Sequence, residues 1–303
     1  MRYSAVSCVV AAFATLAATV LPLGTAAAGE PAWAPVVVPA VRQGDIRSAR
    51  TGHDYRIYVS EPAGPPPPAG YPVLYVLDGN AMFPVAAFLA RRVADRRTVT
   101  GWTPPLVVGI GYPQAGDFDV PARTRDYTPG DDAQLSETSG GADRFLDFIE
   151  NEVKPLVARQ HRVDPGRQAV FGHSFGGLLV LHAWLTRPTM FSSFLASSPS
   201  IWWNERRVLQ ALDKPLAGAD SRLLMTVGSL EDQPPGGNVS REIRETLARR
   251  PMVSEARSLA RRLQDSPAGK DRVRFVELEG EDHGSAWLPA LTRGVRAFAD
   301  PRP

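Results

Sequence analysis

A serine in a tight-turn pattern is the first residue of this sequence that could do chemistry. The segment Gly172-His-Ser-Phe-Gly176 has the spacing G-x-S-x-G, with an apolar run at 169–171 before it and another at 178–185 after it. A strand, a sharp turn and a helix in that order hold a serine hydroxyl on an exposed corner, where it can act as a nucleophile. The alternative is an ordinary turn of small residues. We predict that Ser174 is a nucleophile.

A serine hydroxyl needs a base to remove its proton, and that base is usually a histidine. Of the five histidines, His173 lies inside the turn, His182 falls on the following helix, and His53 and His161 precede the serine in polar surroundings. His283 follows the last strand candidate, where the chain order serine, acid, histidine places the base. We predict that His283 is the base; the alternative is a solvent-exposed loop histidine.

The acid that would orient this histidine is expected on the loop after the strand candidate 223–227. That loop, residues 228–233, contains the adjacent carboxylates Glu231 and Asp232. We predict Glu231 and keep two alternatives, Asp232 or a serine–histidine pair without a working acid. Asp282 is a poor candidate because it is the chain neighbour of His283, and adjacent residues rarely reach each other in this way.

Attack on a carbonyl creates an oxyanion, which two N–H groups must stabilise. The backbone N–H of Phe175, directly after the serine, is the first predicted donor. The turn Asp78-Gly-Asn80 ends a strand candidate and opens a helix, so it can present the Asn80 N–H as the second. The alternative is an ordinary strand-to-helix turn in which Asp78 caps the helix.

Two further stretches are candidates for substrate binding. Arg125 can bind an anionic or catecholic group, or it can pair with its neighbour Asp126. Trp202 and Trp203 follow another strand candidate, and they can stack on an aromatic substrate or wedge a helix onto the sheet.

Strand and helix candidates alternate along the chain, which predicts an α/β fold with a mostly parallel central sheet and helices on both faces. The carboxyl ends of parallel strands meet at one edge, and each motif above falls at such an end. The segment 62–68 is proline-rich and is expected to form a stiff hairpin loop. The strand candidates are 55–60, 73–77, 106–110, 169–171, 193–196, 223–227 and 273–278, and the helix candidates are 83–97, 145–156, 178–185 and 240–264.

Composition and the first segment limit the setting of the protein. Arg2, an apolar run at 6–23 and the small residues 26–28 predict a secretory signal peptide at 1–28, followed by a single domain at 29–303. The alternative is an uncleaved membrane anchor. Cys8 is the only cysteine, so the mature chain would have no disulfide, thiolate metal site or catalytic cysteine. A periplasmic or secreted location follows, with no integral membrane segment after cleavage.

Several other classes of function find no support. The formal net charge of +2 gives no argument for nucleic acid or an anionic membrane. The pairs Arg249-Arg250 and Arg261-Arg262 are expected on a solvated helix face. No H-E-x-x-H motif, P-loop lysine or calcium loop is present in the sequence, so no metal and no cofactor are predicted. The sequence gives no indication of the oligomeric state.

These motifs together resemble a known family. The stretches D-G-N-A-M-F, R-D-Y-T-P, G-H-S-F-G-G-L, S-S-P-S-I-W-W-N, G-S-L-E and G-E-D-H-G-S-A-W look like the putative-esterase branch of the α/β-hydrolases. Within that branch they are most similar to the periplasmic ferric-siderophore esterases of the salmochelin, enterobactin and bacillibactin type. The resemblance runs from about residue 55 to residue 287.

The resemblance implies an α/β-hydrolase fold and a serine esterase that needs no cofactor. It implies Ser174 as nucleophile, His283 as base, and Asn80 and Phe175 as oxyanion donors, with Glu231 as the least secure member of the triad. The implied substrate is a small-molecule ester, a catecholate siderophore macrolactone that can be iron-loaded. The alternatives are a general carboxylesterase, a feruloyl- or acetyl-ester hydrolase, an acyltransferase, and a siderophore-binding protein with an inactive triad.

Overall fold

The computed structural model describes residues 34, 37–114, 116–130, 138–213, 220–234, 239–267 and 269–300. The chain divides into two units, Met1–Val38 and Pro39–Pro303. The predicted signal peptide at 1–28 lies outside the described residues. Among the residues that the structure describes, every helix and strand belongs to the second unit.

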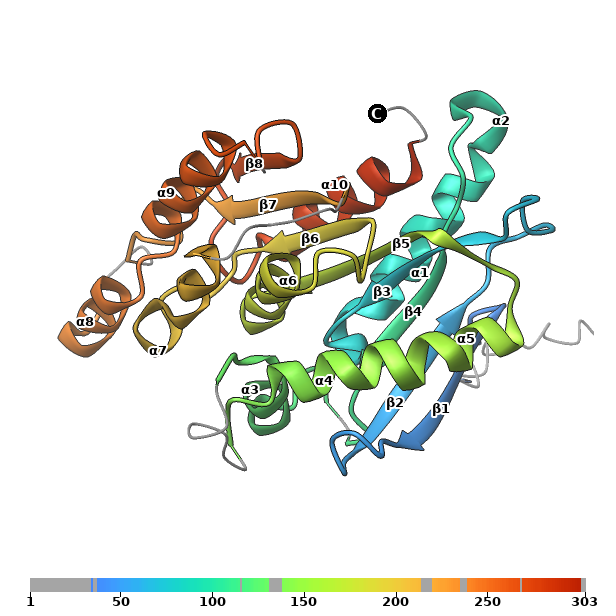
Figure 1. The fold of residues 1–303 in the computed structure, drawn as a ribbon, viewed down its shortest axis with the longest axis horizontal. Helices are drawn as coiled ribbons and strands as arrows, with labels where there is room; N and C mark the ends of the chain where they lie inside the picture. Colours follow the sequence, from blue (N-terminus) through green and yellow to red (C-terminus); the bar gives the residue numbers. More distant parts are fainter. Residues whose placement is uncertain are drawn as a thin grey trace, which may run out of the picture. The chain divides into compact units, whose positions relative to one another are not determined.

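One eight-stranded sheet organises this unit, with the strand order β1-β2-β4-β3-β5-β6-β7-β8 (Figure 1). The pairs β1·β2 and β2·β4 are antiparallel, and β3 to β8 are joined by parallel pairs. The predicted mostly parallel sheet is therefore confirmed. The strands are β1 (Val41–Arg47), β2 (Asp54–Ser60), β3 (Tyr71–Val76), β4 (Leu106–Gly111), β5 (Val163–His173), β6 (Ser193–Ser197), β7 (Arg222–Gly228) and β8 (Val273–Leu278).

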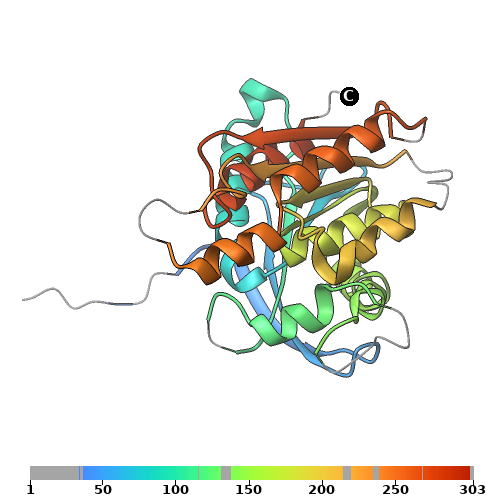
Figure 2. The ribbon, with the colours of Figure 1, turned by 90° about the vertical axis from the view of Figure 1, so that its left-hand side faces the viewer.

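Helices cover both faces of the sheet, as predicted (Figure 2). One face packs against α1 and α10, and the other packs against α4, α5, α6 and α9. The helices are α1 (Gly79–Asp95), α2 (Arg97–Thr100), α3 (Val120–Tyr127), α4 (Ala142–Phe148), α5 (Lys154–Gln160), α6 (Phe175–Thr186), α7 (Trp203–Arg206), α8 (Arg241–Arg249), α9 (Val253–Gln264) and α10 (Trp287–Ala299). A π-helical turn (Ile149–Val153) joins α4 to α5, and a 3-10 segment (Arg207–Asp213) follows α7.

The central strands are apolar on both sides because both faces of the sheet are covered. Every residue of β3 and of β4 is buried. Side chains alternate along β3, so Leu74 and Val76 face the α1/α10 layer while Val73 and Tyr75 face the opposite layer. This burial holds the carboxyl ends of the strands in a fixed arrangement.

Three local predictions need correction. The proline-rich segment 62–68 does not form a hairpin loop, because it joins β2 to β3 and these strands are separated by β4. The helix expected over 240–264 is two helices, α8 and α9, interrupted at Pro251, which has no N–H to continue the helix. β1 was absent from the predicted strands because most of its residues are exposed and it lacks an apolar pattern.

Candidate active site

Ser174 lies on a strained turn between β5 and α6. Its backbone φ of 62° and ψ of −118° are unusual for a residue with a side chain. The turn is as tight as the motif requires, since a Cβ on Gly172 would lie 2.4 Å from the carbonyl of Gly176. The Ser174 N–H donates to the Ser197 carbonyl at the end of β6 (3.0 Å). The hydroxyl is therefore held at the carboxyl end of the sheet and half-exposed.

His283 reaches this hydroxyl from the loop between β8 and α10. The distance between His283 Nε2 and Ser174 Oγ is 3.1 Å, which is hydrogen-bonding range for a nucleophile and its base. The other ring nitrogen, Nδ1, lies 2.6 Å from Glu231 Oε2. The two contacts leave the His283 ring oriented between an acceptor carboxylate and a hydroxyl donor.

Glu231 is buried and fixed from its other side. Its Oε1 accepts hydrogen bonds from the Ser198 hydroxyl (2.5 Å) and the Gly228 N–H (2.6 Å), and the residue is 4% exposed. The Asp232 carboxylate has turned away and accepts from the N–H groups of Met252, Val253 and Ser254, at the start of α9. Of the two carboxylates on this loop, only Glu231 lies at the His283 ring.

His173 lies next to His283 and contacts a different serine. The two ring centroids are 4.7 Å apart, and His173 Nδ1 lies 3.1 Å from the Ser197 hydroxyl. Burial lowers the pKa of His173 well below its usual value, and the nearby His283 and Arg123 lower it further. His173 is therefore a neutral packing residue at pH 7.

The predicted oxyanion donors begin two helices. Asn80 is the second residue of α1 and Phe175 is the first residue of α6. The N–H groups of a helix's first turn have no carbonyl one turn earlier to bond, so they are available to an anion. The Asn80 side chain anchors the turn, since its amide donates to the Tyr112 carbonyl (3.0 Å) and accepts from the Tyr112 N–H (2.9 Å).

Asp78, just before this helix, makes no side-chain capping bond to it. Asp78 nevertheless occupies the N-cap position, where its carbonyl accepts from the Met82 N–H, so the capping alternative holds for the backbone and not for the side chain. Its backbone is left-handed, with φ 50° and ψ 49°, and its buried carboxylate pairs with Arg123. No sequence signal linked the two residues.

Arg125 pairs with its chain neighbour. Its guanidinium donates to both carboxylate oxygens of Asp126, at 2.7 and 2.9 Å. Asp126 also accepts from the hydroxyls of Tyr55 and Tyr112. The geometry favours the ion-pair alternative for Arg125 over direct substrate contact.

The two tryptophans lie beside the serine. The backbone N–H of Trp203 donates to the Ser200 carbonyl, and the Ser200 hydroxyl lies 3.4 Å from Ser174 Oγ. The ring of Phe175 lies 4.9 Å from that of Trp203 and 6.0 Å from that of Trp202. A cavity of about 480 Å³ opens here, lined by Pro129, Gly130, Ser139, Gly140, Trp202, Trp203 and Asn204.

Arg250 adds a positive charge next to the tryptophans. Its guanidinium carbon lies 4.6 Å from the centre of the Trp202 ring, a distance typical of a cation–π contact. Arg250 is exposed at the end of α8, as expected for a solvated helix face, and its contact with Trp202 is an additional feature that was not predicted. Nothing in the sequence around Arg249-Arg250 indicated that Arg250 would stack on Trp202, which is distant in the chain.

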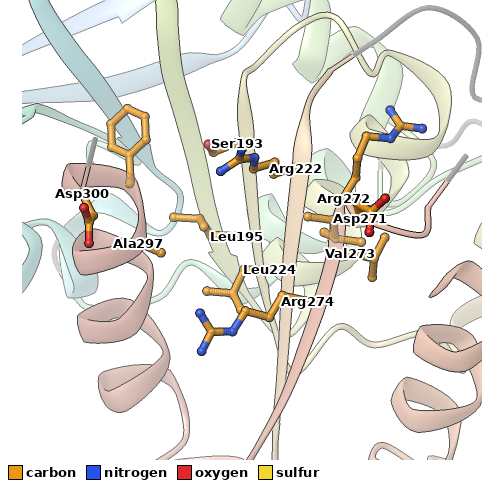
Figure 3. Close-up of a pocket in the computed structure, with 12 residues that line it drawn as sticks. Ser193, Leu195, Arg222, Leu224, Asp271, Arg272, Val273, Arg274, Ala297 and Asp300 are labelled. Carbon is orange, nitrogen blue, oxygen red and sulfur yellow. The ribbon is translucent and has the colours of Figure 1, made fainter. Parts of the chain in front are cut away.

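A second cavity lies at the opposite end of the sheet. Its volume is about 550 Å³, and its walls come from the first residues of β6, β7 and β8 and the last turn of α10 (Figure 3). Arg222, Arg272 and Arg274 contribute to its lining. None of its lining residues is a histidine, so it contains no counterpart of the Ser174–His283 pair.

Within the described ranges, no cluster of three or more His, Cys, Asp or Glu side chains is arranged to hold a metal ion. None of the helices in the described part of the chain is both long and apolar enough to cross a membrane.

Comparison with known proteins gives one consistent family. Residues 48–298 match the family described as Putative esterase. The ferri-bacillibactin esterase BesA of Bacillus subtilis is 36% identical over 276 residues, which are 86% of this chain and 90% of that protein. The siderophore triacetylfusarinine C esterase of Aspergillus fumigatus is 36% identical over 296 residues, or 89% and 96% of the two chains. The solved structure of the siderophore hydrolase EstB from Aspergillus nidulans matches with a TM-score of 0.79 at 32% identity, covering 90% of this chain and 100% of that one.

Proposed function

Because the chain belongs to the Putative esterase family and is a carboxylic ester hydrolase, we propose that it cleaves siderophore lactones with Ser174, His283 and Glu231 as its catalytic triad. The observation that carries this proposal is the hydrogen-bonded series from the buried Glu231 carboxylate through the His283 ring to the Ser174 hydroxyl.

The reaction follows from that geometry. His283 Nε2 accepts the Ser174 proton while Ser174 Oγ attacks the ester carbonyl carbon. Glu231 accepts a hydrogen bond from the Nδ1–H of His283. It therefore selects the tautomer whose Nε2 carries no proton, and it stabilises the imidazolium that forms. The N–H groups of Phe175 and Asn80 stabilise the oxyanion. His283 then protonates the leaving alkoxide, and a water molecule activated by the same ring releases the acyl group from Ser174.

The proposed substrate is a macrolactone of a catecholate siderophore. The support comes from the relative that is named for ferri-bacillibactin and from the cavity lined by Trp202 and Trp203, whose rings contact Phe175 of the nucleophile turn. Flat aromatic arms can stack on Trp202 and Trp203, and Arg250 places a cation where an anionic catecholate would benefit from it. No cofactor takes part in these steps.

We also propose that the protein acts in the periplasm or is secreted, because the sequence of 1–28 has the features of a cleavable signal peptide. Intact mass of the protein recovered from cell fractions tests this. A mature chain that starts near residue 29 in the periplasm or medium is expected, and a full-length chain retained in the membrane fraction would contradict it.

The substrate proposal is tested by product analysis. The purified protein is incubated with bacillibactin and an enterobactin-type trilactone, each with and without iron, with triacetylfusarinine C, and with p-nitrophenyl esters. Mass spectrometry should show linear and monomeric fragments of the catecholate lactones, and none with Ser174→Ala. Turnover of p-nitrophenyl esters alone would replace the siderophore proposal with a general carboxylesterase.

A further inference from the structure

A buried guanidinium joins the two turns that carry the proposed oxyanion donors. Arg123 Nε and Nη2 donate to the two carboxylate oxygens of Asp78, each at 2.9 Å. The same Nη2 donates to the backbone carbonyl of His173 at 3.2 Å. Arg123 is 9% exposed and Asp78 is 2% exposed, so solvent screens this pair weakly.

Each partner of Arg123 lies two residues before a proposed donor. Asp78 precedes the turn that leads to Asn80, and His173 precedes Ser174 and Phe175. Both turns have positive φ angles at residues with side chains, 50° at Asp78 and 62° at Ser174. Such backbone geometry persists only where the surroundings hold it. The three hydrogen bonds of Arg123 are part of those surroundings on both sides.

The rest of the contact set fixes the guanidinium in place. Its carbon lies 5.6 Å from the ring centres of both Tyr127 and Phe175, and the Asp78 N–H donates to the Tyr127 hydroxyl at 3.1 Å. A Cβ added to Gly176 would lie 3.5 Å from Asp78 Oδ2, so the carboxylate reaches the first turn of α6. Burial opposes the charge of Arg123, but Asp78 together with Tyr127 and Tyr112 outweighs that effect, and the pKa of Arg123 is raised.

We infer that Arg123 is a positioning residue that sets the separation of the Asn80 and Phe175 N–H groups. The inference rests on the proposed function, in which these two groups hold the oxyanion. Arg123 itself does not touch the reacting atoms. It ties the start of α1 to the nucleophile turn through a forked donor that binds a carboxylate and a carbonyl together.

The direct test is Arg123→Lys, with Asp78→Asn as a second variant that changes the other partner without altering its size. Lysine keeps the charge, but its three N–H donors all lie on one nitrogen, so it lacks the planar fork that spans both Asp78 oxygens and the His173 carbonyl. Loss of one oxyanion donor costs about 10²–10³-fold in kcat, and partial misplacement should cost about 10–10²-fold. We expect that fall in kcat for both variants, with KM changed by less than about threefold because ground-state binding does not use the oxyanion site.

Two readouts separate positioning from simple destabilisation. Rates are expressed per active site titrated to completion with a fluorophosphonate, so unfolded molecules are not counted. The Ki of a trifluoromethyl ketone, which forms an oxyanion on Ser174, should rise in parallel with the loss of kcat/KM. Arg187→Lys is the matched control, since Arg187 also binds carboxylates through several bonds but lies at the far end of α6. Its kcat and Ki should stay at wild-type values.

The outcomes are distinct. Wild-type kcat and Ki per titrated site in Arg123→Lys and Asp78→Asn would overturn the inference while leaving the esterase mechanism intact. A loss confined to the fraction of titratable sites would overturn it as well, because it would show a purely structural role. Failure of the wild-type protein to hydrolyse any ester would instead contradict the proposed function.

Discussion

The two ends of the central sheet differ in chemistry, although each has a cavity of similar size. At the carboxyl ends of β5, β7 and β8, the loops bring Ser174, Glu231 and His283 into one hydrogen-bonded series. At the amino ends, the cavity next to α10 is lined by arginines, aspartates, one serine and apolar side chains, and none of its lining residues is a histidine (Figure 3).

The direction of the chain explains this difference. Strands β3 to β8 all end at one edge, and α1 and α6 begin there, so the free N–H groups of their first turns are available at that edge. At the other edge α10 ends, which leaves helix carbonyl groups there instead of helix N–H groups. The arginines of that cavity can donate hydrogen bonds, but its lining has no histidine to activate a serine, and therefore cavity volume alone does not identify the site of chemistry.

Glu231→Gln should have the largest effect among the variants that compare the two ends. The amide keeps the shape of the side chain but presents N–H where His283 Nδ1 now meets a carboxylate oxygen, which favours the wrong tautomer. We expect kcat to fall about 10²–10⁴-fold with little change in KM, measured on a p-nitrophenyl ester.

Asp232→Asn is the control for that variant. Asp232 binds the first N–H groups of α9. Asparagine keeps the oxygen that accepts from Met252 and Val253 but loses the charge and the acceptor for the Ser254 N–H, so the melting temperature should fall slightly and kcat should stay near wild type. A larger loss of kcat in Asp232→Asn than in Glu231→Gln would show that the structure assigns the wrong acid.

Trp202→Leu should have a moderate effect that depends on the substrate. An aromatic pair contributes about 0.5–1.5 kcal/mol beyond the area it buries, which corresponds to a roughly 2–10-fold rise in KM. The rise is expected for an aromatic acyl ester and not for an acetyl ester. Phe88→Leu is the control. Phe88 is an exposed aromatic residue on α1, and its substitution should leave both KM values unchanged. Equal effects of Trp202→Leu on both esters would argue against stacking.

Arg274→Ala, in the cavity at the amino ends, should have the smallest effect. Arg274 is exposed and lies at the start of β8, at the other end of the sheet from His283. We expect kcat/KM within about twofold of wild type and a stability change within about 0.5 kcal/mol, as for most surface substitutions. A substantial loss of turnover would mean that this end of the sheet takes part in the reaction.

Much of the fold could be predicted because its signals are local. Buried parallel strands are continuous apolar runs, and the G-x-S-x-G turn at Ser174 lies between a strand and a helix. The role of the 62–68 segment was misjudged because β4, which separates the strands it joins, occurs later in the chain. A local pattern carries no information about a strand that is inserted between two others.

The candidate site was predictable where a sequence motif fixes the position of a residue. It was less predictable where the direction of a side chain on a loop decides its role. Turn type and chain order predicted Ser174 and His283 as a pair, and the structure places them in hydrogen-bonding contact. Glu231 and Asp232 are adjacent carboxylates, and only the path of their loop turns one to His283 and the other to α9. Arg123 was passed over for Arg125 because its partner, Asp78, lies 45 residues away in the sequence.

Covalent labelling of Ser174 is the most direct test of the central claim that its hydroxyl is activated by His283. The protein is treated with a fluorophosphonate, digested, and mapped by mass spectrometry, in parallel with His283→Ala. We expect one adduct per chain, on Ser174, with a labelling rate that falls by several orders of magnitude in His283→Ala. An unlabelled Ser174, an adduct on another residue, or equal labelling rates in the two proteins would contradict the account.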